Sequence, residues 1–160
     1  MRVYIFAAGL LTAAPLSMAA QVTIPFSVTA TVMRGCAVSA ADLVFGNYLA
    51  TAAPPTVLAT STISVTCELG DTYTIGLSDG ANPSGTQRRM LRTAPPVAYL
   101  SYNLFRDAGL TQVWRDTGPT RLSGVGTGLP QAHTVYGQLP GGQIVPVGAY
   151  IDTVTVTVRN

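Results

Sequence analysis

The side chains best suited to chemistry in this 160-residue chain are its two cysteines, Cys36 and Cys67. They follow a leading segment with the pattern of an export signal, so an oxidising compartment and one disulfide bond are expected. Closing a loop of about 31 residues would stabilise the fold by roughly 3.5 kcal/mol on the chain-entropy model. The alternative, a redox or metal-binding pair, has little support because the chain has no CxxC motif and only one histidine.

The remaining polar residues do not indicate catalysis. His133 is the only imidazole and Glu68 the only glutamate, and neither lies in a motif that pairs a nucleophile with a base. The run GVGTG (124–128) lacks the preceding strand and following helix of a phosphate-binding loop, so we expect a sandwich loop there. Four aspartates are too scattered for a calcium site and should be solvated or hydrogen-bonded at turns and strand edges: Asp79, Asp107, Asp116 and Asp152. We therefore expect a protein that is not an enzyme and has no cofactor or metal.

Residues 1–20 are expected to be a signal peptide that is removed on export. The stretch MRVYIFAAGLLTAAPLSMAA starts with a basic residue, continues with an apolar run and ends in the small-x-small pattern SMA (17–19). Cleavage after Ala19 or Ala20 places Gln21 at or next to the mature start. The alternative is a membrane anchor, which needs roughly 20 apolar residues and therefore a longer run.

Charge is sparse and gives no sign of a polyanionic partner. Charged residues make up 10% of the chain, and all nine basic residues are arginine. Without Arg2, nine minus one leaves eight arginines against seven acidic residues, a net charge of +1. So small an excess makes no electrostatic case for binding nucleic acid or an anionic membrane. The absence of lysine also excludes lysine–asparagine isopeptide bonds and lysine-linked polymers.

Alternating apolar and polar residues, separated by glycine and proline, predict strands and turns and almost nothing helical. The strand-like runs are TISVTCEL (62–69), YTIGLS (73–78), AYLSYNLFRD (98–107), HTVYGQL (133–139) and GAYIDTVTVTVRN (148–160). His133 should begin its strand and be partly exposed. The spacing predicts an all-β sandwich. Its buried core should include Phe45, Tyr99, Leu104, Trp114, Tyr150 and Val154.

Half-buried strands are predicted near both ends of the chain. In the first, every second residue is apolar: Val22, Ile24, Phe26, Val28, Ala30 and Val32. In the last, Val154, Val156 and Val158 face one side, and the chain stops at Asn160.

An immunoglobulin-like sandwich normally has one further strand after such a position, and without it an apolar groove and an unpaired edge stay open. The first segment of a neighbouring molecule would fill that groove. The alternative is that residues 22–33 are the first strand of their own sandwich.

Seven blocks of sequence together resemble the spore coat protein U domain, which occurs in subunits of Csu-type archaic chaperone-usher pili. The blocks are CAVSAADLVFGNY (36–48), TISVTCELGDTYTIGLSDG (62–80), RRML (88–91), YLSYNLFRD (99–107), Trp114, HTVYGQLP (133–140) and GAYIDTVTVTV (148–158). They cover essentially all of residues 36–158 in the expected order.

The resemblance implies an exported subunit with one disulfide and an incomplete immunoglobulin-like β-sandwich, completed by donor-strand exchange. A periplasmic chaperone lends a strand to the groove, and at the outer-membrane usher the N-terminal extension of the next subunit replaces it. On this sequence the donor extension maps to residues 21–33 and the domain to residues 34–160. The acceptor groove and chaperone contact would include Val154, Val156, Val158 and Asn160, whose carboxylate is available to a basic chaperone residue.

Two features depart from the family pattern. Members commonly end at or near an aromatic residue, whereas this chain ends Val-Arg-Asn. The donor segment carries Pro25, which cannot donate a hydrogen bond to a neighbouring strand. The function implied is a structural pilus subunit at the cell surface, in a homo- or heteropolymer that serves adhesion and biofilm formation. The alternative is a secreted spore-coat or extracellular-layer protein.

Overall fold

The computed structural model describes residues 27, 29–30, 35–51, 53 and 55–160. Residues Met33–Asn160 form one compact unit, which is treated by itself below. The predicted signal peptide lies outside the described residues, as do five of the predicted donor residues: Val22, Ile24, Phe26, Val28 and Val32. The sixth, Ala30, is exposed and belongs to no strand. No helix in the described part of the chain has the length and apolarity needed to cross a membrane.

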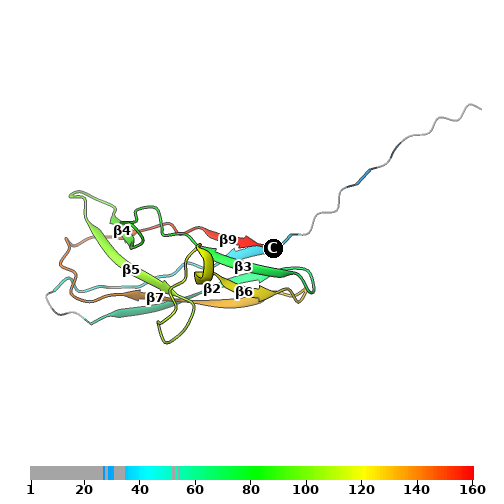
Figure 1. Cartoon of the computed structure of the whole chain (residues 1–160). Helices are drawn as coiled ribbons and strands as arrows, with labels where there is room; N and C mark the ends of the chain where they lie inside the picture. The colour runs from blue at the N-terminus through cyan, green and yellow to red at the C-terminus, as the bar shows by residue number, and fades with distance from the viewer. Residues whose placement is uncertain (1–26, 28, 31–34, 52, 54) are drawn as a thin grey trace, which may run out of the picture. The chain divides into compact units, whose positions relative to one another are not determined.

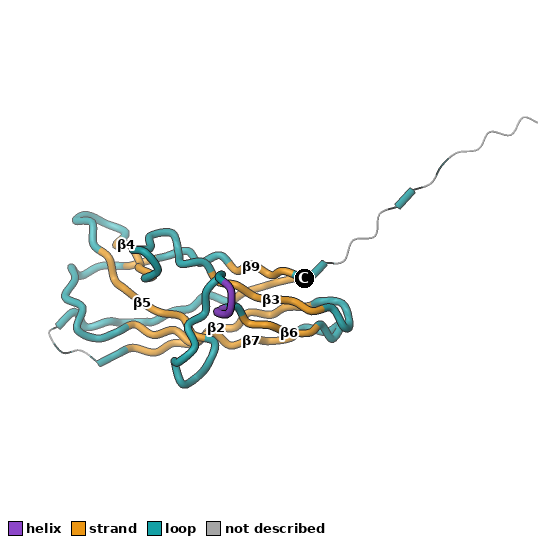
Figure 2. The backbone as a smooth tube through the Cα atoms, viewed as in Figure 1, coloured by secondary structure: helices purple, strands orange, loops and turns teal. Residues whose placement is uncertain are grey.

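The described strands form two antiparallel sheets (Figures 1 and 2). The larger sheet has the order β1 (Ala37–Ala40), β2 (Val57–Thr66), β7 (Gln131–Leu139), β5 (Tyr99–Phe105), β4 (Arg88–Arg92) and β8 (Tyr150–Ile151). The smaller sheet has the order β6 (Leu122–Val125), β3 (Thr72–Leu77) and β9 (Val156–Arg159). A short 3-10 helix, η1 (Gly118–Thr120), precedes β6. The all-β, incomplete immunoglobulin-like sandwich is thus confirmed.

The central pair of the larger sheet follows directly from the alternation in the sequence. Strands β2 and β7 pair from Val57 opposite Leu139 to Val65 opposite Gln131. β-Branched residues dominate β2 and favour a pleated, half-buried surface. Ile63 and Val65 are buried, while Ser64 between them is partly exposed and Thr62 before them is exposed, so one face of the strand reaches the core.

Trp114 lies at the centre of the core, fully buried at 0% exposure. Its indole N–H donates to the Ile75 carbonyl at 2.9 Å, which satisfies its one polar atom. Leu104 is also buried, as predicted. Phe45, Tyr150 and Val154 are only partly buried against the core, because they border an open groove described below.

The prediction that Tyr99 is buried in the core is wrong, since its side chain is 38% exposed. It alternates with buried Leu100 and therefore points to the outer face of β5. There the Arg89 guanidinium carbon lies 4.1 Å from the centroid of the Tyr99 ring, a cation–π contact.

Two further expectations need correction. Residues 124–128 were expected to form a loop, but β6 includes the first two of them and pairs with β3. The final strand is not continuous, because Asp152–Thr155 separate β8 from β9. The Asp152 carboxylate accepts hydrogen bonds from the Ala81 N–H at 2.8 Å and the Tyr102 hydroxyl at 2.7 Å. These two bonds account for the break, because they hold Asp152 outside either strand.

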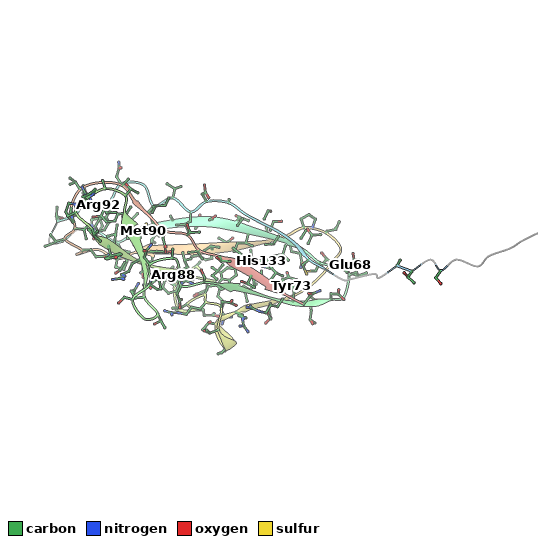
Figure 3. The ribbon with its side chains drawn as sticks, turned by 90° about the horizontal axis from the view of Figure 1, so that it is seen from above. Glu68, Tyr73, Arg88, Met90, Arg92 and His133 are labelled. Atoms are coloured by element: carbon green, nitrogen blue, oxygen red, sulfur yellow. A yellow bond between two sulfur atoms is a disulfide. The ribbon has the colours of Figure 1, made fainter. Side chains whose placement is uncertain are left out.

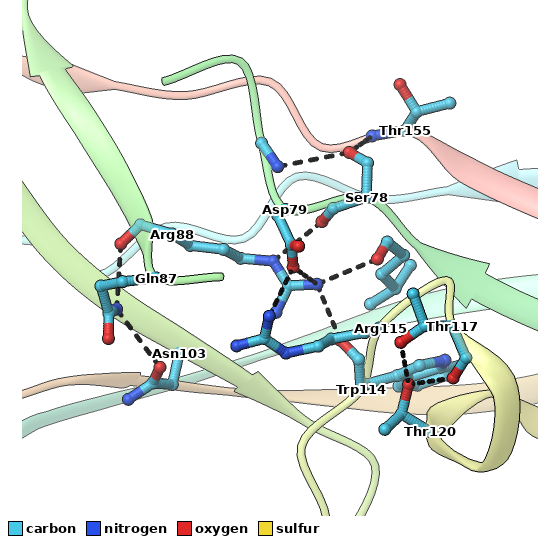
Figure 4. Close-up of polar contacts among 12 residues, drawn as sticks. Ser78, Asp79, Gln87, Arg88, Asn103, Trp114, Arg115, Thr117, Thr120 and Thr155 are labelled. Atoms are coloured by element: carbon cyan, nitrogen blue, oxygen red, sulfur yellow. Dashed lines mark hydrogen bonds and ion pairs between the residues drawn. The ribbon is translucent and has the colours of Figure 1, made fainter. Parts of the chain in front are cut away.

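Arg88 on β4 ties the two sheets together from inside the core, where it is 1% exposed. Its guanidinium donates to the carbonyls of Ser78 at 2.9 Å, Leu77 at 3.0 Å and Trp114 at 2.7 Å (Figure 4). Asp79 lies 3.9 Å away and also pairs with Arg115. The buried charge is thus matched by three carbonyls and a carboxylate.

Candidate interaction groove

An open groove of about 1210 Å³ runs over the core of the domain. Its floor is apolar and comes from both sheets: Ile63, Leu77, Leu100, Leu104, Val135 and Leu139. These side chains are at most 5% exposed, so the floor belongs to the packed core. A long apolar depression of this kind fits an extended peptide that projects side chains inward at every second residue.

One wall of the groove is the extended segment 40–51, which follows β1. Leu43 and Phe45 point inward, and an added Cβ on Gly137 of β7 would lie 2.9 Å from Leu43 Cδ1 and 3.0 Å from Phe45 Cε1. Glycine at that position of β7 therefore lets the wall lie close to the sheet. Among the described residues, no backbone hydrogen bond joins residues 42–48 to a strand, so this wall presents an unpaired edge.

The other wall is the segment 145–152 together with Val154 and Val156. Arg92 on β4 positions its first part, because the guanidinium donates to the Val147 carbonyl from Nε at 3.0 Å and from Nη2 at 2.6 Å. Gly148, at φ +149°, permits this approach, since an added Cβ would lie 2.8 Å from Arg92 Nε. Arg92 and Met90 are labelled on β4 in Figure 3.

Two of the polar residues that line the groove are hydrogen-bonded to each other, Tyr102 on β5 and Asp152 in the second wall. Burial raises the pKa of the Tyr102 hydroxyl above its ordinary value, and its hydrogen bond to Asp152 raises it further. The Tyr102 hydroxyl therefore keeps its proton and acts as the hydrogen-bond donor throughout the physiological range.

The polar residues noted for possible chemistry do not converge on a catalytic arrangement. His133 Nε2 lies 2.8 Å from the Tyr73 hydroxyl oxygen, and burial lowers the pKa of His133 (Figure 3). Glu68 is exposed on the β2–β3 turn. His133 is the third residue of β7 and partly exposed, close to expectation.

The four aspartates are held by hydrogen bonds or ion pairs, as predicted. Asp107 accepts the backbone N–H groups of Thr111 and Gln112 within its turn. Asp116 pairs with Arg159 and Arg121, whose guanidinium groups lower the pKa of its carboxyl to about 2. Asp79 and Asp152 make the contacts given above.

The predicted disulfide is confirmed. Cys36 directly precedes β1 and Cys67 directly follows β2, and their Cα atoms are 4.3 Å apart in the bonded pair. The bond therefore ties the start of the domain to the end of its longest described strand.

The predicted acceptor residues divide between two places. Val154 and Val156 line the groove, whereas Val158 packs against the core without lining it. Asn160 borders a separate, shallower hollow of about 530 Å³ beside β3 and β6.

The prediction missed most of the first wall. The sequence DLVFGNYLA places apolar residues inward at Leu43, Phe45 and Tyr48, but this spacing is irregular and carries no strand signal. Only Phe45 had been singled out, as a core residue. The available signal was the position of this apolar run directly after β1, where an edge strand would continue.

Comparison with known proteins identifies the fold and the family. The family model of the Spore Coat Protein U domain matches residues 22–157. Protein U of Myxococcus xanthus is 39% identical over 104 residues, which are 62% of this chain and 58% of that protein.

Two solved structures are similar. One is the CsuC–CsuE chaperone–tip adhesion subunit pre-assembly complex from archaic chaperone-usher Csu pili of Acinetobacter baumannii. The match has a TM-score of 0.55 and 26% identity, and covers 81% of this chain and 40% of the matched chain. A more distant match is the Hda pilus minor tip subunit HdaB of E. coli, with a TM-score of 0.43 and 14% identity over 76% of this chain and 79% of HdaB.

These matches are to structural proteins, not to enzymes. The chain spans 58% of the length of Protein U and 40% of the matched chain of the Csu complex. The family model includes the groove residues on both walls and both cysteines. The chain therefore belongs to the Spore Coat Protein U domain family, and it is similar to subunits of chaperone-usher pili.

Proposed function

We propose that this chain is a structural subunit of a surface fibre, assembled by the chaperone-usher route through donor-strand complementation. The observation that carries the proposal is the open apolar groove between two walls, one of which has an unpaired backbone edge. An extended strand laid between them would cover the floor and pair with that edge. The fibre would serve adhesion and biofilm formation.

The donor would be residues 21–33 of the next subunit. Its inward residues contribute roughly 1.5–3 kcal/mol each on full burial, a gross sum near 10 kcal/mol before ordering costs. Val154 and Val156 would contact them directly. Val158 would support the groove from the core, and the Asn160 carboxylate would be offered to a basic residue of the chaperone.

The same proposal includes the route to the surface. Residues 1–20 would direct export to the periplasm and be cleaved there. A periplasmic chaperone would occupy the groove until an outer-membrane usher exchanges it for the donor segment of the next copy. The chaperone-bound Csu subunit supports the chaperone step, since that complex contains a subunit of similar fold.

The test uses the chain produced together with its chaperone and usher. Phe26→Asp places a charge on the inward face of the donor segment and should abolish long fibres. Ser27→Asp is the matched control, because alternation puts its side chain on the opposite face. Electron microscopy and unboiled gels distinguish fibres from chaperone complexes and short oligomers.

A chain that lacks residues 21–33 should still bind the chaperone but stop growth. If this truncated chain forms long fibres, residues 22–33 are an ordinary first strand and the proposal is wrong. Equal loss of fibres in Phe26→Asp and Ser27→Asp would also count against an alternating donor strand.

A second candidate function is a secreted coat or extracellular-layer protein. The 39% identity to Protein U favours it. Both functions are compatible with the same groove, so the place where the protein accumulates on the cell distinguishes them. Immunogold labelling on fibres supports the pilus, whereas a continuous layer over spores or cells supports the coat.

A further inference from the structure

The first wall of the groove is divided into two halves at Gly46. Leu43 and Phe45 point inward before this residue and Tyr48 points inward after it, so the alternation slips by one position. Gly46 has a φ of +73°, a left-handed conformation that side chains other than glycine rarely adopt. The packing of Leu43 and Phe45 on β7 therefore does not by itself fix the second half, residues 47–51.

The second half of the wall is attached through the Tyr48 hydroxyl. This group donates a hydrogen bond to the Pro140 carbonyl at 3.1 Å and accepts one from the Gln143 N–H at 2.9 Å. In the part of the chain that the structure describes, no other hydrogen bond joins residues 46–51 to another segment. The position of this half thus depends on one hydroxyl and on the packing of the Tyr48 ring against the core.

The loop that receives Tyr48 is itself fixed to the larger sheet through Gln143. The Gln143 side chain accepts the Ser101 N–H at 2.7 Å and donates to the Ser101 carbonyl at 2.9 Å. β7 pairs with β5 only along Asn103–Phe105, so Gln143 occupies the place that a longer β7 would have beside Ser101. The second wall begins two residues later, at Val145. Tyr48 is therefore bonded to a fixed loop that continues into the opposite wall.

This link matters for strand binding, a step that rests on the proposed function. The unpaired edge of the first wall can pair with a strand only where its N–H and C=O groups have the spacing of a sheet. If residues 47–51 were free, they would have to be ordered when the strand binds, and the entropy lost would weaken binding. A wall that is held in place beforehand avoids that loss.

We infer that Tyr48 is a positioning residue of the groove. Its hydroxyl ties the second half of the first wall to the loop that leads into the second wall, and so holds the unpaired edge in place for an incoming strand. The inference applies to a strand bound in either direction, because the link joins the two walls themselves.

The test compares Tyr48→Phe with Tyr150→Phe in the full chain. Tyr150 also lines the groove, but its hydroxyl donates to the Pro146 carbonyl at 2.6 Å, within the second wall. A labelled peptide with the sequence of residues 21–33 is the probe, and fluorescence anisotropy measures its Kd. We expect the Kd to rise about tenfold in Tyr48→Phe and less than about twofold in Tyr150→Phe. The urea midpoint of unfolding should stay near the wild-type value in both variants.

A double-mutant cycle tests whether Tyr48 acts through Gln143. Gln143→Ala frees the loop, so it should weaken peptide binding at least as much as Tyr48→Phe does. The double variant should then bind no more than about twofold more weakly than the weaker single variant. Losses that multiply in the double variant would show that the two residues act separately, and would overturn the inference.

NMR relaxation tests the link without any peptide. Backbone order parameters of residues 47–51 should fall from about 0.85 to below about 0.6 in Tyr48→Phe, but not in Tyr150→Phe. Unchanged order parameters, equal Kd values in the two variants, or a fall in the urea midpoint that parallels the loss of binding would each overturn the positioning role. A wild-type chain that does not bind the peptide would contradict the proposed function, and the order parameters would still decide whether Tyr48 holds the wall.

Discussion

The Tyr102 hydroxyl on β5 donates a hydrogen bond to Asp152 Oδ2 at 2.7 Å, across the floor of the groove. Because Asp152 also accepts the Ala81 N–H, the pair links the larger sheet to the segment between β8 and β9. A polar link inside an apolar groove fixes the distance between the floor and one wall. The two hydrogen bonds to Asp152 therefore help to hold the second wall in place beside the floor.

Replacement of Tyr102 by phenylalanine tests this link. Tyr102→Phe removes the donor and leaves the partly buried Asp152 oxygen without it, so the free energy of unfolding should fall by about 1–3 kcal/mol. Urea unfolding followed by the fluorescence of Trp114, the single tryptophan, measures this. Tyr48→Phe is the control on the first wall, where the Tyr48 hydroxyl donates to the partly buried Pro140 carbonyl at 3.1 Å. An unchanged free energy in Tyr102→Phe would show that the pair is not a structural link.

Arg88 should be the most sensitive charged residue in the domain. Arg88→Lys keeps the charge but cannot reach three carbonyls with one ammonium group, so we expect a loss of about 3–5 kcal/mol. Arg89→Lys is the matched control, because Arg89 bonds surface carbonyls and stacks on Tyr99, a contact of about 1 kcal/mol. Similar losses in the two variants would contradict the role assigned to Arg88.

The free energy of unfolding should fall as the pH drops below about 6.5, the ordinary pKa of histidine. Burial lowers the pKa of His133 in the folded state, so the unfolded chain binds more protons in this range. The stabilisation is complete above the unfolded pKa and is lost as the pH falls through the folded one.

Urea unfolding between pH 7.5 and pH 5 measures this dependence. His133→Gln should remove most of it, since histidine is the side chain whose ordinary pKa lies in that window. If His133→Gln leaves the pH dependence of the free energy of unfolding unchanged, another titrating group is responsible for it.

Gly137 should matter more for strand binding than for folding. Gly137→Val pushes Leu43 and Phe45 away from β7, which displaces the first wall at a cost of about 1–3 kcal/mol. We expect weaker binding of a peptide with the sequence of residues 21–33, measured by fluorescence anisotropy. Ala132→Val, on an exposed position of the same strand, should bind the peptide like the wild type.

Much of this fold can be predicted from the sequence, because alternation marks residues 62–66 of β2 and 133–139 of β7, although the start of β2 at Val57 was not predicted. The disulfide follows from having two cysteines behind a predicted export signal. The roles of Arg88 and Asp152 could not be predicted from the sequence, because they depend on carbonyls and hydroxyls that the fold brings together from distant strands. Tyr99 shows the opposite failure, in which an aromatic residue was assigned to the core although its position on β5 points outward.

The disulfide has a mechanical consequence for a fibre built in this way. Tension along the fibre would enter each domain at Cys36, directly behind the donor segment. The covalent bond passes that load to Cys67 at the end of β2, and so bypasses the four-residue strand β1. β2 is paired with β7 along nine residue pairs, which would share the load in shear. Under reducing conditions the same pull would first peel β1 away from β2, so a fibre of this chain should yield at lower force once its sulfurs are reduced.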